Sequence, residues 1–94
     1  MSKQASGIDV GVTYAGAEKP FKMEYDPDTT LQTVKSAVME AFGLAESTDA
    51  QGNQTVYRLY RGGDRLDDLG QTLDQASKNE HHLQLRLVRE VIAG

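Results

Sequence analysis

The stretch that decides the fold is residues 8–42, IDVGVTYAGAEKPFKMEYDPDTTLQTVKSAVMEAF. In residues 8–14 and again in 21–25, apolar side chains alternate with polar ones or glycine, which is the period of a half-buried β-strand. The segment between them contains glycine and proline, so the two strands are predicted to form a hairpin. From Leu31 to Phe42 apolar residues recur every three or four positions. That spacing predicts a helix of about three turns with a single apolar stripe.

Shorter elements are predicted on the C-terminal side of this helix. Residues 45–55 are polar and predict a loop, and Gly62-Gly63 predicts a tight turn. The other elements are a strand over 56–61, a short strand over 65–67, a short helical turn within 69–78 and a final strand over 83–87. The order is therefore β-β-α-β-β-β. We expect residues 1–7 to be a disordered head and residues 89–94 to be a flexible tail.

Composition narrows the class of protein. The chain has 94 residues, which fits one domain, and it has no cysteine, so it offers no disulfide, thiolate ligand or thiolate nucleophile. Its net charge of −4 disfavours a nucleic-acid partner, which a basic surface would attract. The start of the chain does not resemble a signal peptide, and no apolar run is long enough to cross a membrane. We therefore expect a cytoplasmic protein.

Four strings of residues, in this order along the chain, carry a family resemblance. They are 30–35 (TLQTVK), 58–68 (RLYRGGDRLDD), 71–73 (QTL) and 82–87 (HLQLRL). Together they resemble ubiquitin over about residues 8–88. The resemblance implies an α+β, ubiquitin-like β-grasp fold, in which one main helix packs on one face of a mixed four- to five-stranded sheet. The long loop at 45–55 and the single terminal glycine depart from eukaryotic ubiquitin, and the chain looks more like a bacterial ubiquitin-like modifier.

The resemblance gives the C-terminal residue Gly94 a role. In ubiquitin-like modifiers the terminal glycine carboxylate is activated by an activating enzyme, passed on by a conjugating enzyme, joined to a target amine and later released by an isopeptidase. Such a chain is a substrate, so the resemblance implies no enzyme activity, no catalytic residue, no cofactor and no metal. A glycine has no Cβ and passes most easily through a narrow channel to a reaction centre. The expected tail consists of Arg89, Glu90, Val91, Ile92, Ala93 and Gly94.

A partner-binding face is expected on the strands. The positions of the apolar patch of ubiquitin fall here on Tyr60, Gln84 and Arg86, and Arg58 lies on the same predicted strand as Tyr60. This patch is more polar than that of ubiquitin, so its receptors are expected to differ. Two exposed lysines, Lys3 and Lys35, are the candidate acceptors for chains of modifiers.

Several alternatives remain open at this stage. The final strand can continue through Ile92, which would leave only two residues free. The chain can be a non-covalent interaction module or a self-associating scaffold, because exposed sheet edges favour assembly. A sulfur carrier is a further alternative, although such tails end in two glycines and this one has Ala93 before Gly94. The pair His81-His82 predicts a surface turn and not a metal site, because neighbours on a strand point to opposite faces.

Overall fold

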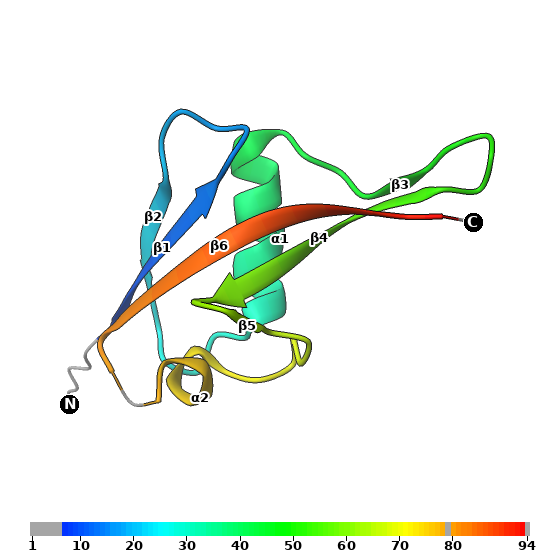
Figure 1. Ribbon diagram of the computed structural model, residues 1–94. Coiled ribbons are helices and arrows are strands. Elements are labelled where there is room, and N and C mark those ends of the chain that lie inside the picture. Colours follow the sequence, from blue (N-terminus) through cyan, green and yellow to red (C-terminus); the bar gives the residue numbers. More distant parts are fainter. Residues whose placement is uncertain (1–6, 79, 94) are drawn as a thin grey trace.

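The computed structural model describes residues 7–78 and 80–93, so most of the predicted head, including Lys3, and the terminal Gly94 lie outside the described residues. The described residues form six strands and two helices (Figure 1). They are β1 (Ile8–Tyr14), β2 (Phe21–Tyr25), α1 (Leu31–Phe42), β3 (Ser47–Thr48), β4 (Gln54–Arg61), β5 (Asp64–Arg65), α2 (Leu73–Ser77) and β6 (His82–Ile92). No helix in this part of the chain is both long and apolar enough to cross a membrane.

The strands form one mixed sheet in the order β2-β1-β6-β4-β3, and β5 pairs with β4 outside that path. The first and last long strands are parallel neighbours, with Val12 opposite Leu85. All other pairs are antiparallel. Strand β6 lies between β1 and β4, and its side chains Leu83, Leu85 and Leu87 form a buried apolar row on the helix side.

Helix α1 has a capping residue at each end. The Thr30 hydroxyl caps the first turn by accepting the Thr33 N–H, and Gly43 ends the helix in the left-handed conformation at φ 70°. One face of α1, with Leu31, Val34 and Val38, is fully buried against the sheet. This is the predicted stripe, although Phe42 at its end is only partly buried.

The core lies between α1 and one face of the sheet. Its buried apolar members are Ile8, Val10, Val12, Leu31, Val34, Val38, Tyr57, Leu59, Leu73, Ala76, Leu83, Leu85 and Leu87. Tyr14 extends this core at the end of β1, where its ring stacks on Phe42 at 5.9 Å and meets the edge of Tyr57 at 6.1 Å. The α+β class, with one main helix on one face of a mixed sheet, is confirmed.

Two boundaries differ from the predictions. Residues 45–55 are not wholly a loop, because Ser47 and Thr48 form β3 and pair with the start of β4. The predicted tail from Arg89 was also wrong in its extent, because β6 continues to Ile92. The reason is that β4 begins early, at Gln54, and its first residues provide backbone partners for residues 90–92 of β6.

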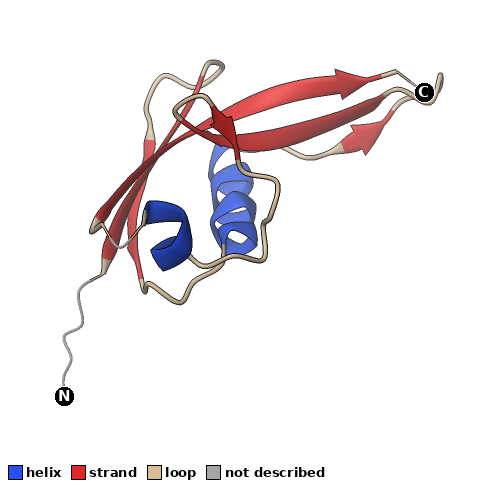
Figure 2. Cartoon of the chain, turned by 60° about the horizontal axis from the view of Figure 1, so that its bottom comes forward, coloured by secondary structure: helices blue, strands red, loops and turns tan. Residues whose placement is uncertain are grey.

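The extended strands form a projection that we call the arm. It consists of β3, residues 54–56 of β4 and residues 90–92 of β6, and it extends beyond the end of α1 (Figures 1 and 2). The turn at its tip is closed by Asp49, whose Oδ1 accepts the backbone N–H groups of Gln51 and Asn53, both at 2.9 Å. The arm lies outside the buried core, so its side chains are mostly exposed.

Candidate protein-binding face

The face of the sheet that is opposite α1, here called the open face, collects the predicted partner-binding residues. Leu59 and Leu87 are buried on the helix side. Because alternate residues of a strand point to opposite sides, Arg58 and Tyr60 on β4 and Gln84 and Arg86 on β6 project from the open face. The structure therefore places all four predicted residues on one surface.

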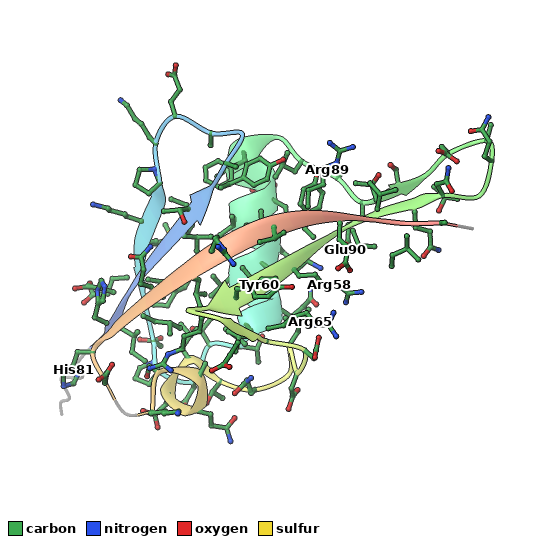
Figure 3. All side chains as sticks on the ribbon, viewed as in Figure 1. Arg58, Tyr60, Arg65, His81, Arg89 and Glu90 are labelled. Carbon is green, nitrogen blue, oxygen red and sulfur yellow. The ribbon has the colours of Figure 1, made fainter. Side chains whose placement is uncertain are left out.

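Tyr60 and Arg86 form the centre of this surface. They are directly opposite in the β4–β6 ladder, and the Arg86 guanidinium carbon lies 5.4 Å from the centre of the Tyr60 ring. A cation over an aromatic face at an exposed site contributes about 0.5–1 kcal/mol. On the other side of Tyr60, Arg65 of β5 is its ladder neighbour (Figure 3). Arg65 is held by Asp67, with Nε 2.6 Å from Oδ1. In the sheet, Tyr60 therefore lies between Arg86 on β6 and Arg65 on β5.

Glu90 also lies on the open face, although it was predicted to belong to the tail. Arg58 Nε donates to Glu90 Oε1 at 3.2 Å, from β4 to β6 (Figure 3). Both side chains are more than a third exposed, so solvent screens the pair and we expect it to add less than about 1 kcal/mol. Its effect is to hold both side chains in place. The contact between Arg58 and Glu90 was not predicted, because the final strand was predicted over 83–87 and Glu90 was placed in the tail. A strand that continues to residue 90 brings these opposite charges side by side.

Gln84 has a different role from the other three. Its side chain lies over Gly11 of β1, where an added Cβ would meet Gln84 Oε1 at 2.8 Å. Because Gly11 has no side chain, the open face is hollowed here into a shallow depression of about 440 Å³, which reaches Lys22 and Glu24 on β2 and His82 on β6. This hollow was not predicted from the sequence, because it depends on the register of three strands.

The expected tail is mostly strand. Val91 and Ile92 are 56% and 38% exposed, and they pair with Thr55 and Gln54 of β4. Ala93 is exposed beyond the end of β6. Gly94, the predicted conjugation terminus, lies outside the described residues. Val91 and Ile92 are therefore exposed apolar residues on a fixed arm.

Lys35 is not the freely exposed lysine that was expected. Its side chain is only 11% exposed, and its Nζ lies 3.2 Å from Glu46 Oε2. The same oxygen accepts the backbone N–H of Tyr57 at 2.9 Å. Burial opposes ionisation of Glu46, but the Tyr57 N–H and the Lys35 ammonium outweigh it, so the pKa of Glu46 lies below its usual value. The pairing of Lys35 with Glu46 ties α1 to β4 and occupies the amine.

His81 and His82 do not form a metal site with other described side chains. His81 and His82 are both exposed, and His82 pairs in register with Asp9. Within residues 7–78 and 80–93, no group of three or more His, Cys, Asp or Glu side chains is arranged to hold a metal ion.

The comparisons with known proteins concern the fold. No family model and no curated protein matches the sequence. Among solved structures, the ubiquitin of Caldiarchaeum subterraneum superposes with a TM-score of 0.65 at 19% identity, covering 94% of this chain and 99% of that one. A structure described as molecular mimicry of SUMO in DNA repair also gives 0.65, at 15% identity and 92% and 95% coverage. The ubiquitin-like domain of an Arabidopsis thaliana protein gives 0.59 at 21% identity, covering 94% of this chain and 84% of that one. The chain therefore has the ubiquitin-like β-grasp fold.

Proposed function

We propose that the chain is a ubiquitin-like protein modifier that is joined to target amines through the carboxylate of Gly94. The observation that carries the proposal is the direction of β6, which leaves the core and runs along the arm to an exposed Ala93. Strand β6 therefore ends on the arm, beyond the end of α1 (Figure 1). The structural similarity to an archaeal ubiquitin supports the same function.

The chemistry belongs to the partner enzymes. The Gly94 carboxylate oxygen attacks the α-phosphorus of ATP on an activating enzyme, and the acyl adenylate forms as pyrophosphate leaves. A cysteine thiolate of the enzyme then displaces AMP and forms a thioester, which passes to a conjugating enzyme. A target lysine amine attacks the thioester, so an amide forms and the thiol is released. An isopeptidase hydrolyses this amide, which returns the Gly94 carboxylate and the lysine amine. Free thiolates are required, so we place the function in a reducing compartment such as the cytoplasm, in a bacterium with dedicated enzymes.

The test is an activation assay with the cognate activating enzyme, ATP and magnesium. The full chain should give an ATP-dependent adduct that disappears on treatment with a reducing thiol. Deletion of Gly94 alone is a clean control, because every β6 pair up to Ile92 remains. Glu18→Ala, in the exposed connection between β1 and β2, serves as a matched surface variant with an intact terminus. Equal adduct yields from the full chain and the Gly94 deletion would contradict the proposal.

A second candidate function is a non-covalent interaction module, which the arranged open face favours. Arg86 is placed over Tyr60, and Arg58 is held by Glu90, so the surface is ordered before a partner arrives. Tyrosine and arginine are enriched at binding hot spots. Such a module keeps its function without Ala93 and Gly94 and loses it on Tyr60→Ala. Removing Val91 and Ile92 as well would be a poor test, because it also removes two β4 pairs.

A further inference from the structure

One edge of β6 is left unpaired beyond the end of β1. The parallel ladder with β1 covers β6 only from His82 to Leu87, where β1 ends at Tyr14. On the other side, β4 pairs with β6 as far as Ile92. In the described part of the chain, the edge of β6 that faces β1 therefore has no strand partner from residue 88 to residue 92. We call this segment the free edge.

The alternation of the backbone identifies the groups that the free edge offers. The Asp9 N–H donates to the carbonyl of His81 at 2.9 Å, so the odd-numbered residues of β6 direct their backbone groups toward β1. Beyond Leu87 these are Arg89 and Val91. Apart from the strand ladders, no backbone hydrogen bond between described residues involves either of them. Their N–H and C=O groups are thus available to an added strand.

Charge at this edge favours one kind of partner. A hollow of about 500 Å³ lies where β1 leaves β6, between residues 14–16 and residues 86–89. Arg86 flanks it on the open face, and Arg89, which pairs in register with the buried Tyr57, flanks it on the helix side. Within the described residues neither arginine has a carboxylate at salt-bridge distance, whereas Arg58, Arg61 and Arg65 each have one.

We propose that the free edge of β6 binds an extended acidic segment of a partner protein by strand addition. The segment would continue the line of β1, form hydrogen bonds with the backbone of Arg89 and Val91, and place carboxylates beside Arg86 and Arg89. Main-chain hydrogen bonds would supply affinity, and the two arginines would supply selectivity. A second copy of this chain is a poorer occupant. Two-fold antiparallel pairing that places Arg89 opposite Val91 also places Glu90 opposite Glu90, and like charges directly opposite destabilise a sheet.

The experiment uses the full chain and a capped synthetic peptide of alternating valine and glutamate, about six to eight residues long. Binding is measured by calorimetry, and backbone amide exchange is followed by NMR. We expect saturable binding with slower exchange of the Arg89 and Val91 amides. A peptide of alternating valine and lysine, with the same β-propensity pattern, should bind at least about tenfold more weakly, which corresponds to about 1.4 kcal/mol.

Three variants sharpen the test. Arg89→Glu should weaken binding at least about tenfold, whereas Lys22→Glu, the same change of charge on β2, two strands away from β6, should change it less than about twofold. Val91→Pro removes an outward N–H without removing a bond to β4, so it should abolish binding while circular dichroism shows an intact fold. Equal binding of both peptides, unchanged amide exchange at Arg89 and Val91, or concentration-dependent dimerisation through this edge in sedimentation would overturn the proposal. None of these measurements depends on Gly94.

Discussion

Removal of the Glu46 carboxylate is expected to loosen the connection between the arm and the helix. One oxygen of Glu46 accepts both the Tyr57 N–H at 2.9 Å and the Lys35 ammonium at 3.2 Å. A hydrogen bond to a charged group contributes about 1.5–3 kcal/mol when it is well buried. The Glu46 side chain is 41% exposed, so solvent reduces this, and we expect Glu46→Ala to cost about 1–2 kcal/mol. For a domain of this size that lowers Tm by roughly 4–16 °C.

A double-mutant cycle separates the two contacts. Lys35→Met keeps the buried stem of the side chain and removes its charge, so we expect a loss of about 0.5–1 kcal/mol. Because the ion pair is already absent in Glu46→Ala, the double variant should lose less than the sum of the two single variants. Urea denaturation followed by circular dichroism measures all four free energies of unfolding. Additive losses, or a Glu46→Ala variant as stable as the parent, would refute the role assigned to this carboxylate.

The same contact predicts a pH dependence. The folded-state pKa of Glu46 lies below its ordinary value near 4.5, because the hydrogen bonds and the ion pair outweigh the effect of burial. Its contribution is therefore fully present above pH of about 4.5 and is lost as the pH falls through the lowered pKa. When the pH is lowered from neutral to below this lowered pKa, the parent should lose more stability than Glu46→Ala. Parallel stability curves for the two proteins over this range would contradict the assignment.

Three further substitutions test the fold by thermal and urea unfolding. Leu59→Ala, at a position that is fully buried, should cost about 2–5 kcal/mol, and a loss under about 1 kcal/mol would place this side chain outside the core. Gly43→Ala forces an alanine to φ near 70° and should cost roughly 1 kcal/mol, whereas no loss would argue against the left-handed cap. Gly11→Ala should leave stability unchanged or raise it by up to about 1 kcal/mol, because the Cβ meets only the mobile end of Gln84 and glycine is unfavourable within a strand. A large loss there would show that the hollow over Gly11 is required for folding.

The fold was predictable because its strongest signals are local. The alternation in residues 8–14 and the spacing of Leu31, Val34 and Val38 each identify an element without any knowledge of its neighbours. The parallel pairing of β1 with β6 is not local. The resemblance to ubiquitin implied only that the sheet is mixed, and the structure supplies the strand partner and the register, with Val12 opposite Leu85.

The end of β6 at Ile92 was predicted only as an alternative, because it also depends on a neighbouring strand. Residues 89–92 carry no clear alternation, and they are strand because residues 54–57 of β4 lie beside them. The exposure of Lys35 was misjudged because its partner Glu46 lies in a segment that was expected to be a loop. The predicted grouping of Arg58, Tyr60, Gln84 and Arg86 on one surface was sound, since alternation along two adjacent strands is enough to place them together.

Mass spectrometry of proteins from the native host tests the central claim most directly. Trypsin cleaves after Arg89, so a conjugated target would keep the remnant Glu90 to Gly94 on a lysine amine. The proposed function predicts lysines that carry this remnant, and predicts their disappearance when Gly94 is deleted from the chain. If the chain accumulates in the cell only as free protein with the unmodified intact mass, and no lysine carries the remnant, the covalent function is contradicted.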